Sequence, residues 1–373
     1  MLTSHRGMFR FVVGLIAVAP LSMAASTASA ADDTSYTWST PQFVITPEFM
    51  GIPGDGSIRA GVNSGGFIDG AGKLRIIFAT GTTVSGNASA VSSDGGQTWT
   101  LDSAFTWPAS ISDTLGHIYV TPSPTGGFRA FLRDATGVKT AVSADGQTWA
   151  PEDGYRVRAA DLGLQRIDGG AVVRLTNGTY KMYLGDESDY FRQCGSARPV
   201  STKIYSASST DQLNWTVDPG YRIGTELGEL CKLHPHAFTD AAGAPVVVFH
   251  VNNDISKSRS EWASSCFIAS SVDGVTFPSM SRLPVNLPNG TPGGELSCDD
   301  PDIVRMPDGT LRLFFSVGGP LPNGGRVAMS VGTPVSLPAT GTNPIDGLVW
   351  GLAVSTAGAL LVVATRRQRI FNP

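Results

Sequence analysis

The 373-residue sequence has no basic cluster and a net charge of only −4, which argues against a nucleic-acid-binding protein. It also has few long apolar runs between residues 31 and 336. Glycine is abundant by contrast, with 44 residues in the chain. A segment of some 300 residues with this composition favours one large all-β domain. We expect this domain to be a monomer.

The long apolar runs that the middle lacks lie at the two ends of the chain. Residues 1–30 are typical of a secretory signal peptide. A basic start is followed by an apolar core from Phe11 to Met23, and Ala28-Ser29-Ala30 is a small-residue cleavage site. We therefore expect a secreted protein whose mature chain begins near Ala31.

The C-terminal segment, residues 337–373, combines three features in a fixed order. Leu337-Pro338-Ala339-Thr340-Gly341 is followed by a mostly apolar segment, 347–364, and then by three arginines. At about 1.5 Å per residue the apolar segment would span about 27 Å, close to the thickness of a thin bilayer core. The arrangement resembles the LPxTG sorting signal of Gram-positive cell-wall proteins. It implies that a sortase cleaves between Thr340 and Gly341 and joins the protein to peptidoglycan, after a transient stage in the membrane. The alternative is a simple C-terminal membrane anchor.

A short polar turn that ends in an aromatic residue repeats through residues 31–336. Four copies end at Trp99, Trp149, Trp215 and Phe277, and a degenerate fifth copy ends at Trp38. The gaps of 61, 50, 66 and 62 residues fit a four-stranded propeller blade with its loops. Five strand-turn-strand units lie between these turns, and only the last unit has no turn of its own. The sequence therefore predicts a five-bladed β-propeller in which an N-terminal strand completes the last blade and closes the ring.

The repeated turn, S-x-D-x-G-x-T-W, resembles the Asp-box of sialidases and of five-bladed glycoside hydrolases. Its aspartate can accept hydrogen bonds from the backbone of the turn, and its glycine supplies a positive φ. The resemblance implies that the aromatic residue packs between blades and that the turn lies on the outer rim. We therefore assign a structural role, and no catalytic one, to Asp94, Asp145, Asp211 and Asp273.

Candidate functional residues lie where each innermost strand begins, because propeller sites are found at the mouth of the central channel. Every blade supplies a charged or imidazole side chain at this position, which indicates a ligand site. The alternative is a solvated channel lined by hydrogen-bonded polar groups. The residues are Arg59, His117, Arg166, Asp168, His234, His236, Asp299, Asp300 and Asp302.

With this repeat pattern and blade count, the chain resembles the arabinanase-like and invertase-like five-bladed glycoside hydrolases. The resemblance implies carbohydrate hydrolysis by paired carboxylates. Asp168 matches an inner-strand aspartate of the third blade, and Asp300, before Pro301, is the best second carboxylate. A separation of about 5 to 10 Å between them would support hydrolysis, whereas burial against arginine would support binding alone. The predicted substrate-binding residues are Arg59, His117, Arg166, His234, His236 and Asp302.

Two departures from the family pattern keep other functions open. The first blade offers Arg59 in place of a carboxylate, and the fourth offers His234-Pro235-His236 where the family presents a glutamate. A non-catalytic glycan-binding or adhesion propeller is therefore one alternative. An exo-sialidase is another, and it would need arginines such as Arg59 and Arg166 to hold a substrate carboxylate.

The four cysteines favour two disulfides, because their number is even and the chain is expected to be secreted. Pairing Cys194 with Cys231 and Cys266 with Cys298 would place a disulfide at the same position in successive blades. Zinc is an alternative, bound by Cys231, His234 and His236 with Asp299 and Asp300 nearby. A calcium ion near the axis is also open, and no other cofactor is expected.

Overall fold

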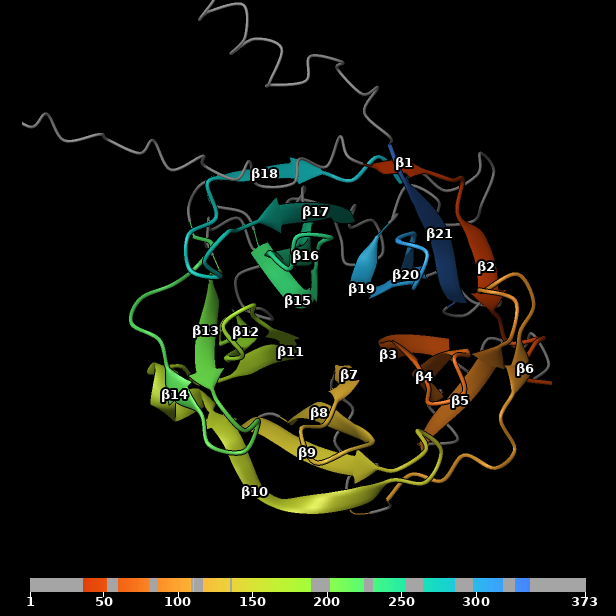
Figure 1. Cartoon of the computed structure of the whole chain (residues 1–373), viewed down its shortest axis with the longest axis horizontal. Coiled ribbons are helices and arrows are strands. Elements are labelled where there is room, and N and C mark those ends of the chain that lie inside the picture. Colours follow the sequence, from red (N-terminus) through yellow and green to blue (C-terminus); the bar gives the residue numbers. More distant parts are fainter. Residues whose placement is uncertain are drawn as a thin grey trace, which may run out of the picture.

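The chain folds into five antiparallel β-sheets arranged around a central axis (Figure 1). The computed structural model describes residues 36–51, 60–80, 86–108, 110, 117–134, 136–188, 202–224, 231–252, 264–285, 298–317 and 326–335. The first four sheets are each built from four strands that follow one another outward from the axis, as in propeller blades. Their strands are β3 (Ala60–Ile68), β4 (Leu74–Thr80), β5 (Gly86–Ser92) and β6 (Thr100–Leu101); β7 (Ile118–Pro122), β8 (Phe128–Asp134), β9 (Gly137–Ser143) and β10 (Ala150–Arg158); β11 (Ile167–Arg174), β12 (Tyr180–Asp186), β13 (Ile204–Ser209) and β14 (Thr216–Val217); and β15 (Cys231–Thr239), β16 (Pro245–Asn252), β17 (Ser264–Ser270) and β18 (Ser279–Arg282).

The fifth blade joins strands from both ends of the described chain. β1 pairs with β21, so that Tyr36 lies opposite Pro334 and Trp38 opposite Gly332. This pairing confirms the predicted closure of a five-bladed propeller by an N-terminal strand. β2 also pairs with β21, and Figure 1 shows both N-terminal strands beside it. The strands of this blade are β19 (Asp299–Arg305), β20 (Leu311–Val317), β21 (Arg326–Pro334), β1 (Tyr36–Trp38) and β2 (Gln42–Ile45).

The hydrophobic core is divided into five clusters, each between two neighbouring blades. Successive residues of a strand face opposite sides of a sheet. Phe314 of β20 therefore packs toward the first blade, while Phe315 packs toward the fourth. Burial on both faces explains why β16 carries four consecutive apolar residues, Val246–Phe249, rather than an alternating pattern.

The four predicted Asp turns connect the third and fourth strands of the first four blades. In the second blade, the Asp145 carboxylate accepts the backbone N–H groups of Gln147 and Thr148 at 2.8 and 2.9 Å. The ring of Trp149 that follows lies 6.3 Å from that of Phe67 in the first blade. The other three aspartates, Asp94, Asp211 and Asp273, accept two backbone N–H groups in the same way. The turns thus join neighbouring blades.

Among the described residues, no helix is both long enough and apolar enough to cross a membrane. The predicted signal peptide, residues 1–30, lies outside the described residues, as does the predicted sorting signal, residues 337–373, with its segment 347–364 and its cleavage site at Thr340 and Gly341. Both remain predictions.

Candidate functional site

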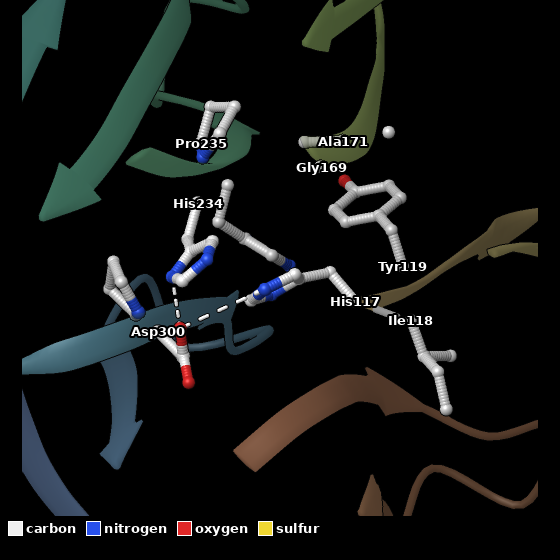
Figure 2. A pocket seen from close by; sticks show the side chains of 11 residues that line it. His117, Ile118, Tyr119, Gly169, Ala171, His234, Pro235 and Asp300 are labelled. Atoms are coloured by element: carbon white, nitrogen blue, oxygen red, sulfur yellow. Dashed lines mark ion pairs between the residues drawn. The ribbon is translucent and has the colours of Figure 1, made fainter. Parts of the chain in front are cut away.

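The innermost strands of four blades bring predicted site residues together at the axis. His117 immediately precedes β7, Asp168 lies in β11, His234 in β15 and Asp300 in β19. His117, His234 and Asp300 line a cavity of about 10 Å³, which has room for about one water molecule or ion. Figure 2 shows the two imidazoles directed toward the Asp300 carboxylate.

The backbone is irregular where these side chains arise. The pairing registers of β11, β15 and β19 with their neighbouring strands all shift at this level. His234 and Asp300 have φ values of 51° and 47°, which are unfavourable for residues other than glycine. Each precedes a proline, Pro235 or Pro301, which disfavours this conformation further. Strain of about 1–3 kcal/mol at each residue is frequent at functional sites.

Asp168 is completely buried at the centre of this group. One carboxylate oxygen, Oδ2, accepts the backbone N–H of His234 at 2.7 Å and lies 3.1 Å from His234 Nε2. The other oxygen lies 3.3 Å from His117 Nε2 and 3.4 Å from Arg133 Nε. Burial alone would raise the pKa of Asp168, but His117, His234 and Arg133 outweigh it and hold that pKa well below its usual range. Asp168 is therefore ionised.

Asp300 is the more accessible of the two predicted catalytic carboxylates, with 16% of its side chain exposed. It contacts His234 Nδ1 and lies 3.7 Å from His117 Nε2. Burial and the charge of Asp299 raise the pKa of Asp300 to about 7. Because His117 Nε2 contacts both carboxylates, the oxygens of Asp168 and Asp300 are separated by no more than the sum of those two distances, about 7 Å.

Burial has the largest effect on the pKa values of the two histidines that face the cavity. It lowers the pKa of His117 to about 3, although Asp168 opposes the shift. It lowers the pKa of His234 to about 3 in the same way. Both imidazoles are therefore neutral near pH 7, and each can offer a lone pair.

His250 belongs to this group but was not among the predicted site residues. It lies at the end of β16, fully buried, with its Nδ1 atom 3.1 Å from His234 Nδ1 and 2.9 Å from Asp299 Oδ1. Burial lowers its pKa, but the neighbouring carboxylates raise it more, so that the net shift is upward. The only signal in the sequence is an imidazole at the end of the apolar run Val246–Phe249.

Two further residues missed by the sequence analysis surround Asp168. Arg133 of β8 binds Glu187 through Nη1 at 2.8 Å, and Arg166 Nη2 lies 3.1 Å from the same carboxylate. Burial and the charge of Asp168 raise the pKa of Glu187 to about 7, against the effect of both arginines. Arg166, a predicted substrate-binding residue, is thus partly exposed at the edge of a buried ion-pair network.

His236 and Asp302 form a separate buried pair beside the cavity. His236 accepts the backbone N–H of Ile303 at Nδ1, 3.2 Å away, and its Nε2 lies 2.7 Å from Asp302 Oδ1. Asp302 Oδ2 in turn accepts the backbone N–H of Gly66. The pair thus links the fourth, fifth and first blades.

The described cysteines are all in disulfides. Cys266 is joined to Cys298, as predicted from the equivalent positions of the cysteines in successive blades. Cys231 is also disulfide-bonded, which removes the thiolate that the predicted zinc alternative requires. The partner predicted for it, Cys194, lies outside the described residues, as does the predicted substrate-binding residue Arg59.

Two groups of described side chains could hold a metal ion. They are His234, His250, Asp299 and Asp300, and His117, Asp168 and His234. In each group one ligand atom per residue lies within 4.8 Å of all the others.

Solved structures place this arrangement in context. The endo-arabinase of Bacteroides thetaiotaomicron superposes with a TM-score of 0.51 at 13% identity, over 80% of this chain and 99% of that enzyme. The α-L-arabinanase of Penicillium chrysogenum, complexed with arabinobiose, superposes with a TM-score of 0.51 at 14% identity, over 79% of this chain and 98% of that enzyme. This chain shares their propeller fold. A structure from the GH130 family of mannoside phosphorylases and glycoside hydrolases superposes with a TM-score of 0.50 at 14% identity, over 73% of this chain and 84% of that protein. No protein-family model matches the chain, and no curated protein matches it.

Proposed function

We propose that this protein is a secreted, cell-wall-anchored glycoside hydrolase that acts on an extracellular carbohydrate at the axial site. The observation that carries the proposal is the convergence of Asp300, His117 and His234 on one cavity from three blades, over the buried carboxylate of Asp168. Structural neighbours named as arabinanases support a carbohydrate ligand through the shared fold.

The spacing of the two carboxylates is compatible with hydrolysis. A separation of up to about 7 Å between Asp168 and Asp300 covers the distance of about 5–5.5 Å typical of retaining enzymes and the start of the inverting range, about 6.5 Å. Asp300 has 16% of its side chain exposed and can reach a ligand at the channel mouth, whereas Asp168 acts through the two histidines that it contacts. We therefore assign the contact with substrate to Asp300.

One observation favours a second function, a non-catalytic glycan-binding propeller. Asp168 has no exposed surface and lies 3.4 Å from Arg133. A carboxylate held in this way cannot approach a glycosidic bond directly. In this second function the axial side chains bind a glycan through hydrogen bonds without cleaving it.

A hydrolysis screen of the propeller domain, residues 31–336, separates the two functions. The panel holds aryl glycosides, arabinans, mannans and a sialoside, the last to test the sialidase alternative. Asp300→Asn is expected to lower turnover about 10²–10⁴-fold while leaving the fold intact. Asp153→Asn, on an exposed surface, is the matched control and should leave turnover unchanged. Saturable binding on a glycan array without turnover by the wild-type protein would establish the second function.

Wall anchoring has its own test, because it rests on the sequence around Thr340. Fractionation of the producing cells should recover the protein with peptidoglycan, and only a wall hydrolase should release it. Thr340→Ala is expected to shift most of the protein from the wall fraction to the membrane fraction. Recovery of most wild-type protein from the medium would contradict the proposal.

A further inference from the structure

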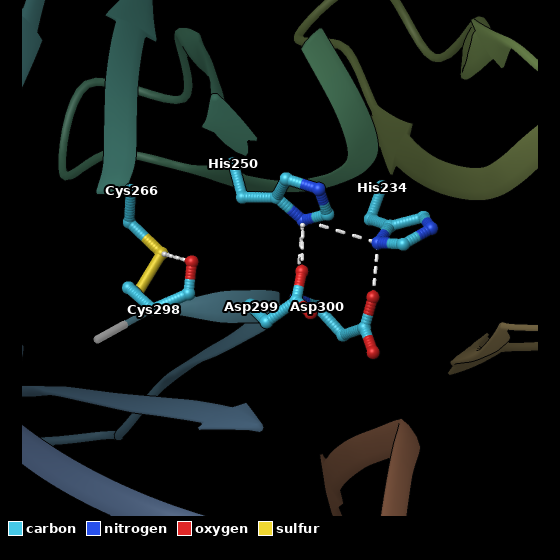
Figure 3. Close-up of a disulfide and its surroundings, with 6 residues drawn as sticks. All are labelled: His234, His250, Cys266, Cys298, Asp299 and Asp300. Carbon is cyan, nitrogen blue, oxygen red and sulfur yellow. Dashed lines mark hydrogen bonds and ion pairs between the residues drawn. A yellow bond between two sulfur atoms is a disulfide. The ribbon is translucent and has the colours of Figure 1, made fainter. Parts of the chain in front are cut away.

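Four potential ligand atoms converge beside the cavity, at the junction of the fourth and fifth blades. Nδ1 of His234 and Nδ1 of His250 lie 3.1 Å apart. Asp299 Oδ1 is 2.9 Å from His250 Nδ1, and Asp300 Oδ1 pairs with His234 Nδ1. Figure 3 shows the two imidazoles and the two carboxylates facing one another across this space.

Hydrogen bonds alone do not satisfy this arrangement. His250 Nδ1 lies 3.2 Å from the backbone N–H of Asp300, which requires a lone pair on the nitrogen, and 2.9 Å from the Asp299 carboxylate, which requires a proton on it. A ring nitrogen carries one or the other. Within the described residues, the buried Oδ1 atom of Asp300 also has no hydrogen-bond partner. A cation placed between the four atoms would accept a lone pair from each of them.

The surroundings orient His234 as they would orient a metal ligand. Asp168 Oδ2 accepts the backbone N–H of His234 at 2.7 Å and lies 3.1 Å from its Nε2 atom. A proton on Nε2 would face this carboxylate, and the Nδ1 lone pair would then face Asp300. A carboxylate behind a coordinating histidine is the usual outer-shell partner in protein metal sites. The complete burial of Asp168, which separates it from a substrate, suits this role.

We propose that His234, His250, Asp299 and Asp300 bind one divalent transition-metal ion of the zinc class. Ligand atoms that share such an ion at about 2.1 Å stand roughly 3–3.5 Å apart, close to the 3.1 Å and 2.9 Å that separate His250 Nδ1 from His234 Nδ1 and from Asp299 Oδ1. Two carboxylates balance the charge of a divalent ion, and two imidazole nitrogens favour zinc-like ions over calcium or magnesium. The ligand set differs from the zinc alternative expected from the sequence, because Cys231 is in a disulfide and His236 is paired with Asp302.

The Cys266–Cys298 disulfide lies between the histidine ligands and the carboxylate ligands in the chain and links the segments near them. Cys298 immediately precedes Asp299, and Cys266 lies opposite His250 in the pairing of β16 with β17. Figure 3 shows the disulfide beside the four ligands. It therefore joins β17, the strand paired with the His250 strand β16, to the segment that carries both carboxylates.

Zinc titration of the purified, chelator-treated protein tests the proposal by calorimetry and by thermal melting. We expect one ion per chain with micromolar or tighter affinity, a rise in Tm, and weaker binding of calcium. Asp299→Asn should lower zinc affinity at least tenfold without unfolding the protein, because 47% of that side chain is exposed. Asp300→Asn should do the same, and Asp153→Asn should leave the affinity unchanged.

Three results would overturn the assignment: no zinc binding by the wild-type protein, equal affinity in Asp299→Asn and wild type, or preferential binding of calcium. The inference does not rest on the proposed function, since ion binding is measured without a glycan. A protein that binds zinc but turns over no substrate supports the ion site and contradicts only the hydrolase. Cobalt in place of zinc adds a visible spectrum, which His250→Gln should weaken or abolish.

Discussion

Replacement of both Cys266 and Cys298 by alanine is expected to destabilise the protein by about 4 kcal/mol and to weaken ion binding at the axis. The stability loss follows from the 32-residue separation of the two cysteines, since a cross-link of that span restricts the unfolded chain. For a domain of this size, the fall in Tm should be about 6–10 °C. Differential scanning calorimetry of the ion-free variant measures it.

The effect on the site is separable from the effect on stability. Leu311→Ala removes a fully buried side chain from the same hydrophobic cluster and should cost about 2–5 kcal/mol. Leu311 lies opposite Arg305, at the far end of the β19–β20 pairing from Asp299. We therefore expect Leu311→Ala to lower Tm while keeping ion affinity. Wild-type affinity in the double-alanine variant would show that the disulfide does not position the ligands.

The fold was predictable because its defining residues are local. Each Asp turn is a short peptide whose aspartate binds its own backbone, so four copies could be read directly from the sequence. The closing strand followed from counting, since only the last blade had no turn of its own. The pairing of β2 with the same strand, β21, was not predicted. Its four residues, Gln42–Ile45, are too few to show a clear strand pattern, and no repeated turn follows them.

The candidate site was predictable only in part, for a physical reason. His117, Asp168, His234 and Asp300 could be placed together because innermost strands begin at one mouth of the channel. His250 lies on a second strand, where register and the bulge at His234 decide which side chains reach the axis. That bulge depends on a positive φ at a residue before proline, which local propensity disfavours. Arg133 and Glu187 were not predicted for a similar reason. Neither lies on an innermost strand, because Arg133 belongs to β8 and Glu187 directly follows β12.

Asp168→Asn is the second substitution with a large expected effect, because it neutralises a buried charge that faces His117, His234 and Arg133. Breaking such a buried network by removing one partner typically costs about 3–5 kcal/mol. Glu187 still neutralises part of the Arg133 charge, so we expect the variant to fold but to melt at a lower temperature. Any activity assay of this variant belongs below its own Tm.

Asp302→Asn is the matched control, because Asp302 is also a buried carboxylate paired with a histidine, His236. Both variants should lose stability, but only Asp168→Asn removes the acceptor that orients His234. Zinc affinity is therefore expected to fall about 10–100-fold in Asp168→Asn and to change little in Asp302→Asn. Equal losses in the two variants would mean that Asp168 supports the propeller axis in general. A selective loss would assign this buried aspartate to the positioning of a metal ligand, and would account for an ionised carboxylate with no exposed surface at the axis.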